Sequence, residues 1–363
     1  MKYVKLFLIT ILVIVFAAQC TPAAETPTAE APVAAAPTAV APAAAAPTAE
    51  VAAPAVTEPE LPLFYGAYAT PIEEPWDGVI HAALQQAAAD GKIRYEFTDD
   101  IGYAGDMERV LREIAENQKP AAILGDAFGN EEAVRRVAVE YPEIAFAFGS
   151  GLGPAEPNMA VFDNWIHEPG YLSGMIAGGV TQSGVIGVVG GYPVPEVNRI
   201  VNAFIDGAKS VNPEAKVIVT FINSWFDPAA AKEAALAQVD AGADVLFAER
   251  FGVIDAAVEK GLFAFGNMSD QNALGPETVI TGPVWNMAPT VDYLIAQVNA
   301  GTFTGMDLKD FSMVGKGGAY LADFHGMDAK IPAELLAKVK ETEQQIKDGL
   351  FRVDIKEEPP VSD

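Results

Sequence analysis

Short apolar runs alternate with amphipathic segments along most of this chain. The apolar runs have the length and composition of buried strands and lie at 63–69, 94–98, 121–124, 144–148, 159–162, 185–189, 217–221, 245–247, 262–265 and 278–281. The segments between them repeat apolar residues every three or four positions, which predicts helices at 77–89, 106–117, 131–140, 171–180, 196–209, 229–241, 289–300 and 332–348. This alternation predicts an α/β fold with parallel sheets.

The pattern of strands and helices starts afresh at Ser183, which marks a boundary between two lobes. We expect the run 159–162 to cross between the lobes. After 281 the chain is expected to return to the first lobe, and two short strands at 310–314 and 319–322 are predicted beyond that return. Roughly 300 residues of folded chain suit two lobes of ordinary size. The predicted lobes are 61–182 plus about 282–318, and 183–281 plus about 319–356.

One predicted helix, 171–180, contains Gly174, Gly178 and Gly179. Each glycine in a helix costs roughly 1 kcal/mol relative to alanine. We therefore expect another backbone to pack closely against this helix.

The first nineteen residues read as a secretory signal. A short basic start precedes an apolar run at 6–18, broken only by Thr10 and too short to span a bilayer comfortably. The only cysteine, Cys20, follows directly, which predicts a lipid attachment site. Gln19 departs from the small residue usual before a lipidated cysteine, so simple cleavage and secretion is the alternative.

Residues 20–60 are almost entirely Ala, Pro, Thr, Val and Glu. Frequent proline blocks helix and favours extended chain. We interpret this segment as a tether between a membrane and the folded part, and a merely disordered N-terminus is the alternative.

The chain is strongly acidic, with 49 Asp and Glu against 23 Lys and Arg and a net charge of −26. Nucleic acid is therefore excluded as a partner, because phosphate binding needs clustered Lys and Arg. The three histidines are scattered without metal-ligand spacing, and no catalytic motif for a nucleophile or a phosphate is present. Asp126, Glu168 and Glu249 could act as acid and base, but nothing pairs them in sequence. We expect no metal, no cofactor and no enzymatic activity.

Aromatic side chains gather in the loops that follow the predicted strands. They include all four tryptophans: Trp76, Phe128, Trp165, Trp225, Phe226 and Trp285. Because ligands of open parallel sheets bind beyond the carboxyl ends of the strands, we expect these rings to share one cleft and to stack on a flat ligand. Individually, each tryptophan could instead fill a local core.

Polar residues beside the aromatic loops could form hydrogen bonds with the edge of such a ligand. The candidates are Asp126, Asn164, Glu249, Arg250 and Asp270. Glu249 and Arg250 could instead pair with each other at a hinge.

Several motifs resemble the basic membrane protein family of substrate-binding lipoproteins from ATP-binding-cassette importers. The resemblance is carried by FINSWFDP at 221–228, GNMSDQ at 266–271, EPGYLSGMIAG at 168–178 and the stretches 187–213 and 234–249. It implies a type I periplasmic-binding-protein fold, with two lobes joined by three crossovers and a purine stacked between aromatic rings. Trp76, Phe128 and either Trp225 or Phe226 stand where the family places those rings.

Two departures from the family pattern bear on the ligand. Met268 stands where the family carries an aspartate that holds ribose hydroxyls, and a common lysine is replaced near Trp285. The resemblance thus implies a receptor for a purine nucleoside or a free purine base, anchored outside the cytoplasm through Cys20, with an ABC permease and its ATPase as partners. A sensory receptor of the same fold is the first alternative, and a nucleoside hydrolase the second.

Overall fold

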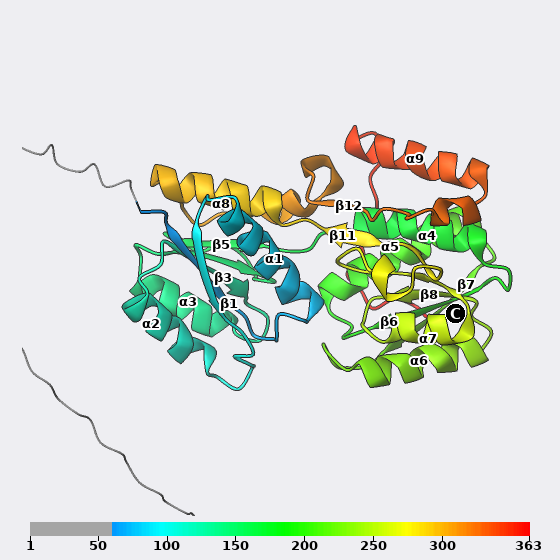
Figure 1. Ribbon diagram of the computed structural model, residues 1–363, viewed down its shortest axis with the longest axis horizontal. Helices are drawn as coiled ribbons and strands as arrows, with labels where there is room; N and C mark the ends of the chain where they lie inside the picture. Colours follow the sequence, from blue (N-terminus) through cyan, green and yellow to red (C-terminus); the bar gives the residue numbers. More distant parts are fainter. Residues whose placement is uncertain (1–59) are drawn as a thin grey trace, which may run out of the picture. The chain divides into compact units, whose positions relative to one another are not determined.

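The computed structural model describes residues 60–363, which belong to one compact unit (Figure 1). The predicted signal at 1–19, the lipid attachment site at Cys20 and all but the last residue of the predicted tether lie outside the described residues. Within the described part, no helix has the length and apolar character needed to cross a membrane.

The first lobe is built on a five-stranded parallel sheet in the order β2-β1-β3-β4-β5. Its strands are β1 (Leu63–Ala67), β2 (Arg94–Thr98), β3 (Ala122–Asp126), β4 (Ala145–Gly149) and β5 (Met159–Phe162). The run 159–162 was predicted to cross between the lobes. It instead pairs with β4 and forms an edge strand of the first sheet.

Helices cover both faces of this first sheet, as Figure 1 shows. They are α1 (Pro75–Ala89), α2 (Met107–Asn117), α3 (Glu131–Glu140) and α8 (Ala288–Ala300). Neighbouring residues of a strand point to opposite faces. Thus Phe64 joins the core under α1 and α8, whereas Tyr65 joins the core under α2 and α3.

The second lobe repeats this design with the parallel order β10-β9-β8-β6-β7. Its strands are β6 (Val185–Gly190), β7 (Lys216–Phe221), β8 (Val245–Ala248), β9 (Phe263–Phe265) and β10 (Val279–Thr281). Its helices are α4 (His167–Val180), α5 (Pro195–Val211), α6 (Pro228–Asp240), α7 (Val253–Lys260) and α9 (Ala333–Lys347). On one face of the sheet, Phe204 of α5 stacks on Phe247 with ring centroids 4.5 Å apart.

Helices α4 and α5 pack backbone against backbone, as the glycines predicted. A Cβ atom on Gly174 would lie 2.0 Å from the carbonyl oxygen of Phe204, and one on Gly178 would lie 2.4 Å from that of Ala208. Gly179 differs, because it faces the side chain of Leu335 on α9. Close contact with α5 thus explains two of the three glycines.

We expect Gly174→Ala to destabilise the protein by about 1–3 kcal/mol, because the added methyl group must push the two helices apart. Chemical denaturation followed by circular dichroism measures this difference. Gly153→Ala is the matched control, since a Cβ at Gly153 has no atom within 4 Å. Equal stability of the two variants would contradict the proposed packing.

This packing also corrects the predicted lobe boundary. Because α4 packs on α5, it belongs to the second lobe, and the chain first crosses between lobes at 163–166 rather than at 182. The other two crossings run through β11 (Pro283–Trp285) and β12 (Ala319–Leu321), which pair antiparallel. Strand β11 thus lies between the predicted strand at 278–281 and the predicted helix at 289–300, where no strand was predicted.

The return to the first lobe ends in turns rather than in the predicted strand. Leu308 donates its N–H to the carbonyl of Val161 on β5. The chain then forms two 3₁₀ turns, Lys309–Ser312 and Val314–Lys316, so the strand predicted at 310–314 is wrong. Glycines explain the turns: Gly317 has a left-handed φ of 76°, and a Cβ on Gly318 would collide with the carbonyl of Phe311.

The end of the chain runs past the predicted limit of residue 356 and stays on the second lobe. The side chain of Asn198 on α5 donates to the carbonyl of Glu357, and the N–H of Asp363 donates to the carbonyl of Val217 on β7. The last residues thus lie along the edge strand of the second sheet.

Candidate functional site

A narrow cleft lies where loops from the two sheets meet. Its walls come from loops after β1, β2, β3 and β4 of the first lobe and from loops after β6, β7 and β8 of the second. The residues that line it are Thr70, Glu74, Trp76, Tyr103, Asp126, Phe128, Ser150, Glu196, Trp225 and Arg250. The carboxyl ends of parallel strands thus frame the cleft, where ligands of such sheets bind.

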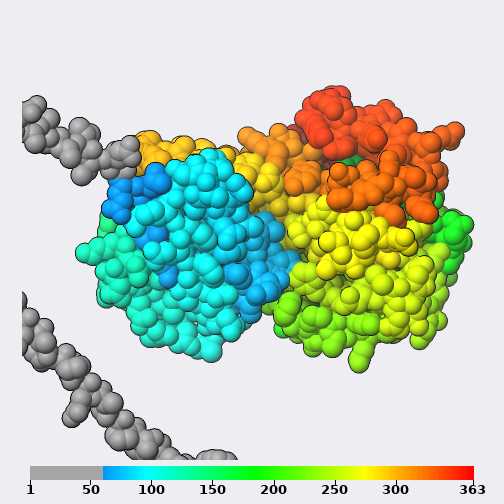
Figure 2. Space-filling model, in the orientation of Figure 1, coloured from blue at the N-terminus to red at the C-terminus, as the bar shows by residue number. Residues whose placement is uncertain are grey.

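The two lobes touch across this cleft. The ring of Phe128 meets that of Trp225 edge to face, with centroids 5.3 Å apart. In Figure 2 the first-lobe residues coloured blue abut the green and yellow surface of the second lobe. The free space between the walls is about 20 Å³, room for about one water molecule. A larger guest therefore requires the lobes to separate.

Trp76 forms part of the first-lobe wall at the start of α1. Its indole stacks on Phe162 with centroids 5.9 Å apart, and it lies 5.0 Å from the ring of Trp285. Gly149 makes this position possible, because a Cβ there would lie 1.8 Å from the indole. Trp76 is only 6% exposed, and its Nε1 has no hydrogen-bond partner in the described structure.

Trp225 forms the opposite wall from the loop after β7. Its indole packs against Tyr192 at 4.8 Å and under the guanidinium of Arg250 at 5.3 Å. Arg250 also donates to the carbonyl oxygen of Trp225 at 2.9 Å. Arg250 therefore fixes both the backbone and the ring plane of this residue.

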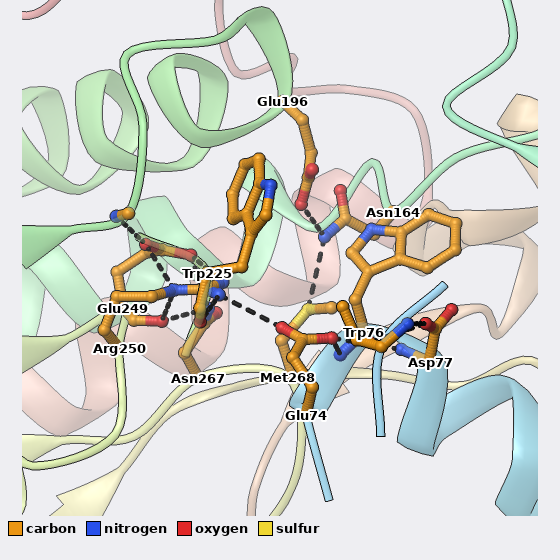
Figure 3. A network of polar contacts seen from close by, with 12 residues as sticks. Glu74, Trp76, Asp77, Asn164, Glu196, Trp225, Glu249, Arg250, Asn267 and Met268 are labelled. Atoms are coloured by element: carbon orange, nitrogen blue, oxygen red, sulfur yellow. Dashed lines mark hydrogen bonds and ion pairs between the residues drawn. The ribbon is translucent and has the colours of Figure 1, made fainter. Parts of the chain in front are cut away.

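A buried ion network joins the lobes below the aromatic walls (Figure 3). Arg250 donates to Glu249 at 2.6 Å within the second lobe and to Glu74 at 3.0 Å in the first lobe. All three side chains are at most 4% exposed. Burial raises the pKa of Glu74, and the positive charge of Arg250 opposes that rise.

Glu74 also shapes the start of helix α1. Its second oxygen accepts hydrogen bonds from the backbone N–H groups of Trp76 and Asp77, at 2.8 and 3.3 Å. A carboxylate at this position satisfies free N–H groups and interacts favourably with the helix dipole. The same residue therefore orients Trp76 and binds the opposite lobe.

Three further carboxyl groups lie in or beside the cleft, and none forms an ion pair within residues 60–363. Asp126 accepts from the N–H of Phe128 at 2.9 Å, and Glu196 accepts from the side chain of Asn164 at 2.6 Å. Asp77 accepts from the backbone and the hydroxyl of Thr70 at 3.0 and 2.6 Å.

Burial is the main cause of the altered acidity of these groups. It raises the pKa of Glu196 to about 8, helped by the charges of Asp163 and Glu249. It raises the pKa of Asp77 to about 7, helped by Glu74, and raises that of Asp126 well above its usual value.

These shifts predict that the stability of the ligand-free protein falls as pH rises from about 5 to about 8. In that range the folded protein retains protons that the unfolded chain has released, so raising the pH favours unfolding. Burial lowers the pKa of His167 to about 4, which opposes this trend at acidic pH, so thermal unfolding should show a clearly falling melting temperature between about pH 6.5 and 8. Glu196→Gln, which cannot ionise, should flatten the slope, and an unchanged slope would contradict the assignment.

The structure does not bring all the predicted aromatic residues together. Trp285 stands behind Trp76 and donates to Ser312 at 3.0 Å. Trp165 lies outside the cleft, where it donates to Asp163 at 3.2 Å. Phe226 is 46% exposed beside Phe251. The expectation of one cleft shared by four tryptophans is therefore wrong, since only Trp76 and Trp225 line it.

Some of the predicted polar residues line the cleft, and others do not. Asp126 and Arg250 line the cleft, whereas Glu249 pairs with Arg250, the alternative left open by the sequence. Asn164 holds Glu196, and its amide also lies 3.2 Å from the sulfur of Met268, which is buried. Asp270 does not line the cleft, and its Oδ2 lies 2.7 Å from Nε2 of His325.

Sequence reasoning missed several lining residues. They are Thr70, Glu74, Tyr103, Ser150 and Glu196, with Asp77 beside them. A usable signal was present, because each follows the carboxyl end of a predicted strand by a few positions. No site for a metal ion, defined as three or more clustered His, Cys, Asp or Glu side chains, exists in residues 60–363.

Comparison with known proteins finds relatives that match most of the folded part of the chain. Residues 72–312 match the family model of PnrA-like ABC transporter substrate-binding proteins. A Brucella abortus protein named as purine-binding is 31% identical over 271 residues, which cover 73% of this chain and 74% of that protein.

A second relative matches more closely over a shorter stretch. A Haloferax volcanii protein, provisionally named an ABC transporter glucose-binding protein, is 36% identical over 208 residues. This match covers 56% of the present chain and only 52% of the relative.

The fold also has solved counterparts. An ABC transporter solute-binding protein from Aeropyrum pernix K1 aligns with a TM-score of 0.69 at 19% identity, over 81% of this chain and 93% of that one. The predicted α/β class with two parallel sheets is confirmed.

Proposed function

This chain belongs to the family of PnrA-like ABC transporter substrate-binding proteins, and we propose that its cleft holds a small planar aromatic ligand, a purine base or nucleoside. Membership confirms the resemblance seen in the sequence motifs. The proteins of this family bind substrates for transport and are not enzymes.

The observation that carries the proposal is the pair of indole rings on opposite walls of the cleft. Figure 3 shows Trp225 of the second lobe and Trp76 of the first on either side of the space below Glu196. A flat ring between two aromatic faces gains stacking in addition to burial, about 1–3 kcal/mol per contact. The relative named as purine-binding supports the same ligand class.

Binding would proceed through hinge motion of the lobes. The free space of about 20 Å³ requires opening before entry, and a ligand that touches both walls favours the closed arrangement. The three crossings at 163–166, β11 and β12 would act as the hinge. The closed complex would then deliver its ligand to an ABC permease and its ATPase, with the protein anchored through a lipid on Cys20 outside the cytoplasm.

A ligand panel tests this proposal. Residues 61–363 are mixed separately with purine bases, nucleosides, sugars and amino acids, and thermal unfolding and tryptophan fluorescence are recorded. We expect purine bases or nucleosides to raise the melting temperature and to quench Trp225. Stabilisation by sugars or amino acids alone would overturn the proposal.

A sugar is the second candidate. It is favoured by the relative provisionally named glucose-binding and by the presence of carboxylates, Arg250 and an indole face in one cleft. Hydroxyl groups donate well to carboxylates, and the carbon face of a sugar packs on aromatic rings. The same panel separates the candidates, because glucose and the purines are measured side by side.

The transport partners need a separate test. Genes for a permease and an ATPase beside this gene would favour transport, whereas their absence would favour a sensory receptor. Incubation with inosine or adenosine, followed by analysis for free base, tests the remaining alternative of a nucleoside hydrolase.

A further inference from the structure

Two carboxyl groups in the cleft have no cation as a partner in the part of the chain that the structure describes. Asp126 from the first lobe and Glu196 from the second line the same small space. Asp126 accepts from the N–H of Phe128 at 2.9 Å and from the hydroxyl of Ser150, and Glu196 accepts from the side chain of Asn164 at 2.6 Å. A carboxyl group accepts several hydrogen bonds when ionised and keeps acceptor capacity when protonated. Both residues therefore keep acceptor capacity that faces the cleft.

The one cation among the lining residues does not donate to either of these carboxyl groups. Arg250 donates to Glu249, to Glu74 and to the carbonyl of Trp225, at distances of 2.6–3.0 Å. No Lys or other Arg lines the cleft. The other donors among the lining residues are hydroxyl and indole N–H groups, so an amino donor for Asp126 or Glu196 would have to come from the ligand.

Independent support comes from buried polar atoms that have no partner. Nε1 of Trp76 lacks an acceptor, and Oδ1 of Asn164 lacks a donor, although both side chains are at most 6% exposed. Figure 3 shows the nitrogen-bearing edge of Trp76 turned toward the amide of Asn164, next to Glu196. Glu196 fixes that amide, because its carboxylate accepts from Nδ2 and leaves Oδ1 free. These unpaired polar atoms lie next to Glu196, so this end of the site is polar.

We propose that the ligand is an amino-substituted aromatic heterocycle that donates N–H groups to Asp126 and Glu196 from two of its edges. This inference rests on the proposed function, because it specifies which planar ligand the cleft selects.

The carboxyl groups of Asp126 and Glu196 determine which ligand substituents the cleft favours. An exocyclic amino group donates to a carboxylate, whereas a carbonyl oxygen at the same position would face it lone pair to lone pair. A site built for a donor rejects an analogue without that donor, because its own buried groups remain unpaired. Since Asp126 and Glu196 belong to different lobes, a ligand with donors at both edges also holds the lobes together.

A protonated acid is the rival explanation, because a neutral carboxyl group can donate to a carbonyl. The two cases differ in proton balance. An amino-bearing ligand favours the ionised acids, so its binding releases protons to the buffer, whereas a carbonyl-bearing ligand favours the protonated acids and its binding takes protons up.

The test compares two purines that share one ring system. Isothermal titration calorimetry is performed on the protein with 2,6-diaminopurine and with xanthine, which carries carbonyl groups at the same positions, and with unsubstituted purine as a reference. We expect diaminopurine to bind at least about a hundredfold more tightly than xanthine. Titrations in two buffers of different ionisation enthalpy should show proton release with diaminopurine.

Equal or tighter binding of xanthine, or proton uptake with diaminopurine, would overturn the inference and leave the proposed function intact. Failure of all three purines to bind would remove the proposed function as well. The wild-type comparison does not depend on how any variant folds.

Two near-isosteric variants locate the preference. Asp126→Asn and Glu196→Gln should each reduce the preference for diaminopurine at least about tenfold, because an amide offers a donor where the carboxylate offers only acceptors. Glu277→Gln is the matched control, since Glu277 is exposed just before the amino end of β10 and should keep the full preference. If neither cleft variant changes the ratio of affinities, these acids do not select the ligand and the inference is wrong.

Discussion

Replacing Arg250 by alanine should destabilise the protein by about 3–5 kcal/mol, because it leaves two carboxylates buried without a cation. Glu249 and Glu74 are at most 4% exposed and take their ion pairs from Arg250. The substitution also removes the hydrogen bond to Trp225 and the guanidinium over its ring. Denaturation by urea, followed by circular dichroism, measures the loss.

Arg109→Ala provides the matched control for this prediction. Arg109 pairs with Glu113 on the exposed surface of α2, where an ion pair contributes at most about 1 kcal/mol. If Arg250→Ala falls within that range too, the buried network does not stabilise the fold as described.

Replacing Trp225 by alanine should weaken ligand binding about ten- to a hundredfold and leave stability nearly unchanged. Loss of one aromatic face removes about 1–3 kcal/mol of stacking. Trp225 is only partly buried and lies in a loop, so its removal leaves no large core cavity. Fluorescence titration is unsuitable for this variant, so calorimetry with the best ligand of the panel is the measurement.

Trp76→Ala should behave differently from Trp225→Ala. Trp76 is buried between Phe162 and Trp285, and removal of such a side chain costs about 3–5 kcal/mol of stability in addition to affinity. Unchanged affinity in Trp225→Ala would mean that this indole is structural only. Equal stability of the two variants would contradict the different environments described for the two rings.

Periodicity predicted most of the elements, but not which elements pack together. The helix at 131–140 and the strand at 94–98 have the observed bounds, because regular apolar spacing depends on local sequence alone. Assignment of α4 to a lobe depends instead on its partner, and its small residues fit equally well against either sheet. Strand β11 and helix α7 were missed because three and eight residues are too few for a clear period.

The sequence predicted where the site lies on the sheets, but not all the residues that form it. Loops after parallel strands do bring Phe128 and Trp225 together, as the position of the loops implied. Whether an indole faces a cleft or a core depends on neighbours from distant strands, as Phe162 and Gly149 do for Trp76. The importance of Glu74 was equally hidden, because its partner Arg250 lies 176 positions away in the chain.

The ion pair between Glu74 and Arg250 has a consequence for the proposed hinge motion. The contact of Glu74 with the start of α1 and that of Arg250 with Glu249 each lie within one lobe, so the proposed opening would leave each charged group with a partner on its own side. Opening and shutting therefore exchange one buried contact for hydration without stranding a charge. The contact between the lobes is therefore reversible in electrostatic terms, and ligand contacts with both walls would decide which arrangement prevails.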